Sequence, residues 1–278
     1  MVIVHRFVFN SCLSNVLAEF DSINIICDKK SGLNILEISE NDKNYPEISQ
    51  IMKKPGVLES IHELFSNSEL EQADWLYIRS TWRCAYPEPR DRFGFLCTTY
   101  NMPKSALDKC SGMICRCQLK QTAPFSLGKT PNWKTRGFTM LNCVEDEIFV
   151  SDTVKHLLAD SQIRGLSFQC VLDKKGNVLN NISQIIVNDT VDPGVDISCV
   201  QRFSVCPYCG NKKIVLKPGM LSISKTCFKS IQSDIVKTSE RFGEITGSRK
   251  ILISHDFYKT IKQNKIDQCL VFQPISLK

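Results

Sequence analysis

Cys206 and Cys209 are the residues whose type and spacing point most clearly to chemistry, and they lie in the segment Cys-Pro-Tyr-Cys-Gly. Two thiolates separated by two residues can bind one metal ion from a single tight turn, in which a glycine after the second cysteine relieves steric crowding. The sequence signals no helix directly after Cys209, which disfavours a redox-active pair. The segment therefore predicts a zinc knuckle, meaning a turn that supplies two ligands to a structural zinc ion.

A tetrahedral zinc site needs two ligands beyond this pair, and two sets compete. The local set adds Cys199 and Cys227, which flank the knuckle, and it is the favoured one. The distant set adds Cys115 and Cys117, in which case the metal would pin the middle of the chain to its C-terminal half. A catalytic zinc would need an open coordination position and a nearby His or Glu base, but none of the four histidines lies near a cysteine pair. The predicted metal is therefore structural.

The sequence lacks the motifs of common enzyme classes, so we predict a binding protein without catalytic residues. It has no glycine-rich phosphate loop, no Gly-x-Ser-x-Gly elbow and no His-Glu-x-x-His helix. One aromatic and basic stretch is the candidate partner-binding surface, because arginine and aromatic side chains anchor protein interfaces and also stack on nucleic acid. Its candidate contact residues are Trp82, Arg83, Tyr86, Arg90 and Arg92.

The chain has 278 residues, of which 42% are hydrophobic and 23% charged, as is typical of a globular protein. The apolar stretch at its start is short and interrupted by charge, unlike a signal peptide, and no run of about 18 apolar residues indicates a membrane span. We therefore expect a cytoplasmic protein. Residues 201–278 contain 14 Lys or Arg and five Asp or Glu, a net charge of +9, so the first 200 residues carry −3. This positive end either faces an acidic partner or is a solvated surface.

Short apolar runs predict strands over residues 24–27, 34–38 and 75–78, and apolar positions recurring every three or four residues predict a helix over 56–65. Two prolines within residues 84–94 indicate a loop. We predict three parts from these patterns. They are an N-terminal α/β region (1–105), an irregular cysteine-containing connector (106–135) and a domain with the knuckle (136–278).

Residues 147–171 and 250–275 resemble each other when they are aligned from their first strands. Each begins with an apolar strand and continues with a serine, Ser151 or Ser254, that is suited to cap a helix N-terminus. A helix with an apolar stripe and a second apolar strand follow, and we assume that the two strands are neighbours in one sheet. The alternative is that so common an arrangement recurs by chance. We predict a mixed α/β (α+β) fold, with two echoed strand-helix-strand units around the knuckle and a smaller N-terminal α/β region.

The order of features in the C-terminal half resembles the bacterial double-CxxCG family. The resemblance rests on the strand and helix before Gly165-Leu-Ser-Phe, then Cys199, Cys-Pro-Tyr-Cys-Gly and the final unit from Lys250, and it covers roughly residues 136–278. That family carries an earlier CxxCG, followed by a Trp and then Tyr-Pro. Here Trp82 and Tyr86-Pro87 correspond to the later residues, but no first CxxCG precedes them.

The resemblance implies a cytoplasmic immunity-type protein that binds and neutralises the cognate toxin of a contact-dependent or polymorphic toxin system. Such a role requires no catalytic constellation. The alternative is a zinc-knuckle nucleic-acid-binding protein, in which the knuckle and the positive C-terminal region contact phosphates. A third class is a secreted effector or an uncharacterised enzyme.

Overall fold

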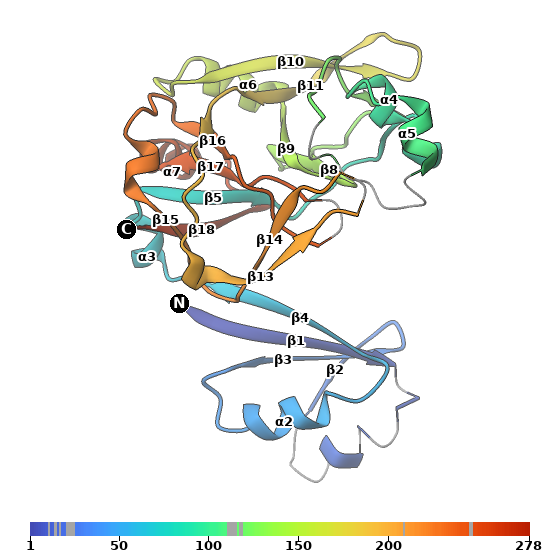
Figure 1. Cartoon of the computed structure of the whole chain (residues 1–278), viewed down its shortest axis with the longest axis vertical. Coiled ribbons are helices and arrows are strands. Elements are labelled where there is room, and N and C mark those ends of the chain that lie inside the picture. Colours follow the sequence, from blue (N-terminus) through green and yellow to red (C-terminus); the bar gives the residue numbers. More distant parts are fainter. Residues whose placement is uncertain are drawn as a thin grey trace. The chain divides into compact units, whose positions relative to one another are not determined.

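The structure, a computed structural model, describes residues 1–10, 12–13, 16, 18–20, 26–109, 116, 119–207, 209–244 and 247–278. Its fold is mixed α/β with sheets predominating, which confirms the predicted class (Figure 1). The chain forms two compact units: unit 1 is Met1–Glu69 with Pro218–Met220, and unit 2 is Leu70–Lys217 with Leu221–Lys278. Within the described ranges, no helix is both long and apolar enough to cross a membrane.

Unit 1 contains an antiparallel sheet with the strand order β2-β3-β1-β4. Its elements are β1 (Val2–Asn10), β2 (Asp28–Lys30), β3 (Leu33–Ser39), α2 (Tyr45–Ile51) and β4 (Val57–Leu64). Alternate residues of β1 are buried, as the two-residue period of a strand requires, and Phe7 and Phe9 pack with Ile48 of α2. The predicted strand at 34–38 is confirmed as part of β3. Residues 24 and 25 of the first predicted strand lie outside the described residues.

The helix predicted over residues 56–65 is wrong, because this segment forms strand β4. β4 pairs with β1 along its whole length, from Val57 opposite Phe9 to Leu64 opposite Val2. Its apolar spacing marks no buried face, since Leu58 is 72% exposed and Leu64 is 56% exposed. Pairing with a distant strand therefore overrides the local pattern.

Unit 2 contains two six-stranded sheets and a two-stranded hairpin. The first sheet has the order β6-β7-β10-β11-β9-β8, with β6 (Pro87–Glu88), β7 (Ser126–Leu127), β8 (Phe138–Leu141), β9 (Val144–Ser151), β10 (Leu166–Asp173) and β11 (Val178–Val187). The second has the order β12-β16-β17-β5-β18-β15, with β5 (Trp75–Ser80), β12 (Thr190–Val191), β15 (Leu221–Ile223), β16 (Ile235–Thr238), β17 (Ile251–Ser254) and β18 (Leu270–Leu277). The hairpin consists of β13 (Val200–Val205) and β14 (Lys212–Leu216).

The other elements whose bounds the structure gives are short helices. They are α3 (Asn67–Glu71), α4 (Phe95–Thr98), α5 (Lys104–Lys109), α6 (Asp152–Ala159), α7 (His255–Gln263) and the 3-10 turns Asp91–Phe93, Ile197–Cys199 and Lys225–Phe228.

The two compact units divide at Glu69 and Leu70, and the three predicted parts, 1–105, 106–135 and 136–278, stay a prediction. Strand β5 confirms the strand predicted at 75–78. β5 lies in the centre of the second sheet, where Ile78 pairs with Ile251 on one side and Phe272 on the other. Strand pairing between residues so far apart in the sequence cannot be predicted from local composition.

Two segments of unit 2 run strand, helix, strand: β9-α6-β10 and β17-α7-β18. The assumption that the two strands of each segment are neighbours is wrong. β11 lies between β9 and β10, and β5 lies between β17 and β18. Each middle strand is antiparallel to both of its neighbours, so the outer strands of each segment are parallel to each other.

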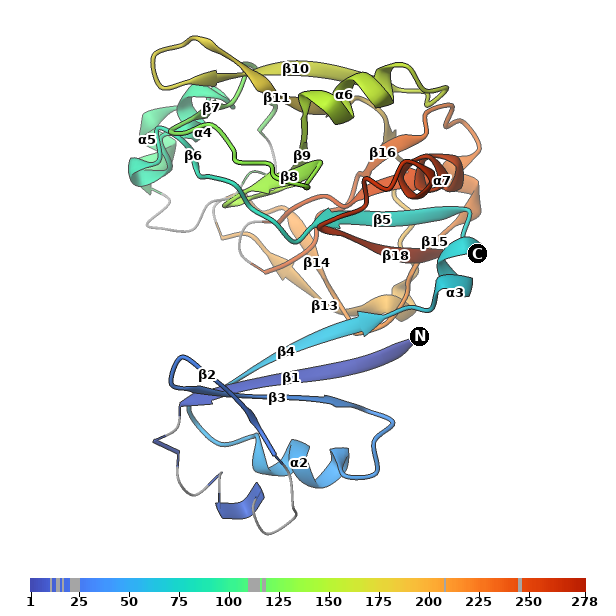
Figure 2. The same cartoon turned by 180° about the vertical axis from the view of Figure 1, so that it is seen from behind.

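Both helices begin at the predicted serines and bury their apolar stripes in one core. The hydroxyl of Ser151 accepts a hydrogen bond from the Val154 amide, and that of Ser254 accepts one from the Phe257 amide. Figure 2 shows α6 and α7 in unit 2. The buried residues that these helices contribute to the shared core are Val154, Leu158, Phe257, Tyr258 and Ile261.

We expect Ser151→Ala to lower the free energy of unfolding by about 1 kcal/mol, because it removes only the helix cap. Ser254→Ala should cost more, since its hydroxyl also donates a 2.9 Å hydrogen bond to Asp234. Urea unfolding of both variants measures the difference, with the two Ser→Thr variants as controls that keep a hydroxyl. Equal losses in the two alanine variants would contradict the second contact.

Candidate functional site

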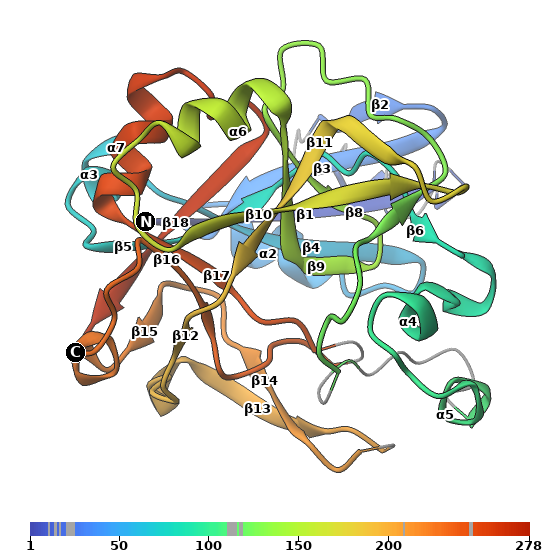
Figure 3. The same ribbon diagram turned by 90° about the horizontal axis from the view of Figure 1, so that it is seen from above.

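Cys206, Pro207, Cys209 and Gly210 lie between the two strands of the β13–β14 hairpin, which Figure 3 shows in orange. The Cys206 amide donates to the Asn211 carbonyl at 3.0 Å, and the Gly210 amide donates to the Cys206 carbonyl at 2.9 Å. Gly210 has a φ of 69°, a left-handed conformation that glycine adopts without strain. The side-chain amide of Asn211 donates to the Cys209 sulfur at 3.1 Å. The tight turn and the role of its glycine therefore agree with the motif.

The structure does not gather the local ligand set Cys199, Cys206, Cys209 and Cys227 into a metal site. Across the described part of the chain, no group of three or more His, Cys, Asp or Glu side chains is arranged to hold a metal ion. Cys227 is buried against another segment, where its sulfur lies 3.6 Å from the Pro193 carbonyl oxygen. Cys115 and Cys117 of the distant set lie outside the described residues. Zinc binding stays a prediction that rests on the Cys206–Cys209 pair.

If the knuckle binds zinc, purified protein should contain about one equivalent of the metal, and Cys206→Ser should lose it together with thermal stability, because structural zinc contributes directly to folding. Metal analysis and thermal unfolding measure both effects. Cys227→Ser and Cys117→Ser then separate the two ligand sets, since only a ligand should lower the metal content. Metal-free protein with unchanged stability in Cys206→Ser would remove the zinc prediction.

Three of the five candidate partner-binding residues, Arg83, Tyr86 and Arg90, line one hollow of about 530 Å³ in unit 2. Lys129 and Lys174 line it as well, so we call this site the cationic hollow. Its lining contains four cationic side chains and a single carboxylate, Glu88. This excess of positive charge favours an acidic ligand.

The charges of the cationic hollow differ in how they are paired. Lys174 lies 3.0 Å from Glu88, and Arg83 lies 3.0 Å from Glu145. Arg90 and Lys129 make no ion pair with any residue whose position the structure gives. These two cations remain available to a partner.

A second hollow of about 390 Å³ adjoins the first, because Tyr86 and Arg90 line both. Arg92 and Phe93 also line it, so four of the five predicted contact residues border these two hollows. Trp82 does not line either one. Its ring packs edge-on against Trp133 with 5.2 Å between centroids, and it is half-buried.

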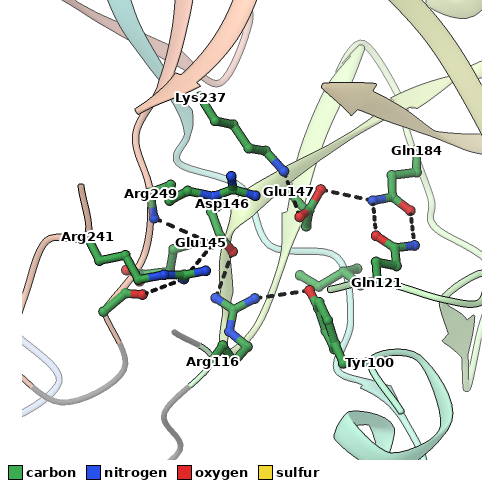
Figure 4. A network of polar contacts seen from close by, with 12 residues as sticks. Tyr100, Arg116, Gln121, Glu145, Asp146, Glu147, Gln184, Lys237, Arg241 and Arg249 are labelled. Atoms are coloured by element: carbon green, nitrogen blue, oxygen red, sulfur yellow. Dashed lines mark hydrogen bonds and ion pairs between the residues drawn. The ribbon is translucent and has the colours of Figure 1, made fainter. Parts of the chain in front are cut away.

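Sequence reasoning missed a group of buried charges in unit 2, which we call the buried charge network (Figure 4). Its members are Arg116, Asp146, Glu147, Lys237, Arg241 and Arg249. The two carboxylates lie side by side on β9, while Lys237 comes from β16. Arg241 and Arg249 lie in the connection between β16 and β17.

Asp146 is the acceptor at one end of the buried charge network. It lies 2.7 Å from the guanidinium of Arg116 and 3.7 Å from that of Arg241, and the Arg249 backbone amide donates to it at 3.5 Å. Arg116 also donates to the Tyr100 hydroxyl at 3.1 Å. Burial alone would raise the pKa of the Asp146 carboxyl, but the cations, Arg116 foremost, hold it below its ordinary value.

Glu147 is the acceptor at the other end. It lies 2.7 Å from the Lys237 ammonium, and the Gln184 side-chain amide donates to it at 2.9 Å. Gln184 in turn exchanges two hydrogen bonds with Gln121, at 2.7 and 2.8 Å. Lys237 and Glu147 are 4% and 9% exposed, so water solvates their charges little and each needs the other as a counter-charge.

One sequence signal could have revealed this network. Asp146 and Glu147 stand directly before the apolar run Ile148-Phe149-Val150, and Lys237 follows Ile235-Val236. A charged side chain inside a buried strand needs an opposite charge beside it. The sequence shows that partners are required without showing which residues they are.

Neither a scan against protein-family models nor a search of curated proteins finds a match to this chain.

Proposed function

We propose that this chain is an immunity-type binding protein that neutralises a cognate toxin by docking an acidic surface of the toxin on the cationic hollow. The observation that carries the proposal is the gathering of Arg83, Tyr86 and Arg90 with Lys129 and Lys174 around one hollow. Tyr86 is 51% exposed at its edge. Exposed tyrosine and arginine around a depression are the side chains that contribute most to protein interfaces.

The ion pairs made by lysines of residues 201–278 also favour a protein partner over nucleic acid. Lys237 is paired inside the buried charge network, while Lys262 and Lys278 each lie 2.6 Å from an aspartate. Cations that already have carboxylate partners contribute less to a continuous basic surface of the kind that binds phosphate backbones. The excess of +9 in residues 201–278 is therefore a weaker argument for nucleic acid than it is in the sequence alone.

The resemblance to the double-CxxCG family supplies the toxin part of the proposal, together with the structural zinc expected at Cys206 and Cys209. The echo between β9-α6-β10 and β17-α7-β18 supports it further, because the resemblance runs through both segments. The same resemblance favours a cytoplasmic location, where an immunity protein would meet its toxin. No catalytic residue is needed for this role.

The test uses the product of the adjacent gene, since immunity genes lie next to their toxins. That product should be toxic when expressed alone and harmless when coexpressed with this chain. Arg90→Glu should weaken binding of the purified toxin at least about tenfold, or ~1.4 kcal/mol, because it places a negative charge in the cationic hollow. Calorimetry measures the affinity, and Lys259→Glu on the exposed face of α7 is the control with the same charge change.

Three results would count against the proposal. One is an adjacent gene product that is not toxic. Another is an equal loss of affinity in Arg90→Glu and Lys259→Glu, which would show a general charge effect. The third is tight binding of nucleic acid that weakens steeply between low and moderate salt, which would favour the nucleic-acid alternative.

A further inference from the structure

The buried charge network forms part of the wall of a pocket of about 470 Å³ in unit 2, which we call the charged pocket. The pocket shares no lining residue with the cationic hollow, so the two sites are distinct. Its volume lies within the range of small-molecule sites, roughly 300–1,000 Å³. Its polar lining includes Gln121, Gln169 and Asn188 beside the charged residues.

The lining of the charged pocket carries more positive than negative charge. Five cationic side chains and two carboxylates line it, and of the cations only Lys120 is exposed. The partly or fully buried set is therefore four cations, Arg116, Lys237, Arg241 and Arg249, against Asp146 and Glu147. Among the side chains that the structure describes, no carboxylate other than Asp146 and Glu147 lines the pocket.

Two guanidinium nitrogens in the wall also lack acceptors. The Nε atoms of Arg116 and Arg249 are buried and make no hydrogen bond to any described residue. Arg116 is 3% exposed. A buried donor without an acceptor costs about 1–3 kcal/mol, and more when it is charged. A ligand with several acceptor oxygens would remove this cost.

We propose that the charged pocket binds a small dianion of the phosphate-monoester type. Two negative charges balance the excess of the buried cations over Asp146 and Glu147, and three phosphate oxygens provide acceptors for the arginines. Guanidinium groups are suited to this because their planar fork matches a phosphate and they remain charged when buried. Gln121, Gln169 and Asn188 then face the rest of the ligand.

Titration calorimetry with inorganic phosphate and with glycerol 3-phosphate tests the site, at about pH 8 so that both probes are dianions. Sodium chloride and glycerol at matched ionic strength are the reference solutes. We expect saturable binding of both phosphates and none of the references. Arg249→Met should weaken binding about tenfold or more, because a charge-assisted hydrogen bond is lost. Lys259→Met, which removes a positive charge outside the pocket, should leave the affinity unchanged.

Two further variants keep the test decisive if Arg249→Met does not fold. Lys120→Met changes an exposed residue at the pocket and should weaken binding severalfold while leaving stability intact. Asp146→Asn removes a negative charge from the wall and should tighten binding, which no purely structural role of Asp146 would produce. Absence of phosphate binding in the wild-type protein overturns the proposal, and so does equal weakening in Lys120→Met and Lys259→Met.

Discussion

Replacing Lys237 with methionine is expected to lower the free energy of unfolding by about 3–5 kcal/mol, because it leaves the Glu147 carboxylate buried without its cation. Glu147 is 9% exposed and would retain only the Gln184 amide as a donor among its present hydrogen-bond partners. Methionine has a similar length to lysine, so the change removes the charge with little loss of packing. Urea unfolding followed by circular dichroism measures the loss.

The double variant of Lys237→Met with Glu147→Gln is the matched control. The Glu147→Gln change removes the buried negative charge and keeps an oxygen for Gln184 to bond. The double variant should therefore recover most of the stability, as expected when both charges of a buried pair are removed. A double variant as unstable as Lys237→Met alone would show that packing, not the ion pair, caused the loss.

Arg116→Met is expected to destabilise the protein strongly at neutral pH and much less in acid. Asp146 has a lowered pKa in the folded protein, so its ionised form stabilises the fold above the ordinary Asp pKa of about 3.9. That contribution is lost as the pH falls through the folded-state pKa. Removing Arg116 takes away the strongest cation acting on Asp146 and should cost about 3 kcal/mol at pH 7, less than a complete loss of partners because Arg241 remains 3.7 Å away.

Chemical unfolding of the wild-type protein and of Arg116→Met at about pH 7 and about pH 3 gives the comparison. Loss of Arg116 should raise the lowered pKa of Asp146, so this carboxyl takes up a proton at a higher pH in the variant than in the wild-type protein. The stability difference between the two proteins should shrink in acid. Combining Arg116→Met with Asp146→Asn should make the remaining difference independent of pH over this range. A constant difference in Arg116→Met alone would mean that Arg116 acts through packing and its hydrogen bond to Tyr100.

Local chemistry in the sequence was enough to predict several features of the fold. Ser151 and Ser254 cap α6 and α7, because a serine before an amphipathic run satisfies the free amides of the first turn. The strand at 75–78 was also predicted correctly, since apolar and β-favouring residues cluster there. The turn at Cys206 and its glycine followed from the motif. Each of these depends on neighbours within a few residues.

Features that depend on distant pairing could not be predicted in the same way. Residues 57–64 have a helix-like spacing but form β4, because β1 offers a complete row of backbone partners. The partners of β5 could not be predicted either, because Ile78 pairs with Ile251 and Phe272, which lie far along the chain. Spacing within one segment cannot report such contacts.

In the candidate sites, too, features formed by neighbouring residues were predictable, whereas those formed by distant residues were not. The arginine- and tyrosine-rich stretch at residues 83–92 and the tight turn at the cysteine pair could be recognised before folding, because both are patterns of neighbouring residues. The fold adds Lys129 and Lys174 to the cationic hollow, and it packs the Cys227 sulfur 3.6 Å from the Pro193 carbonyl oxygen. It also joined Arg116 and Lys237 to the carboxylates of β9. Charges can be recognised one at a time in a chain, but their compensation is a property of the folded interior, where low dielectric and exclusion of water make each partner necessary.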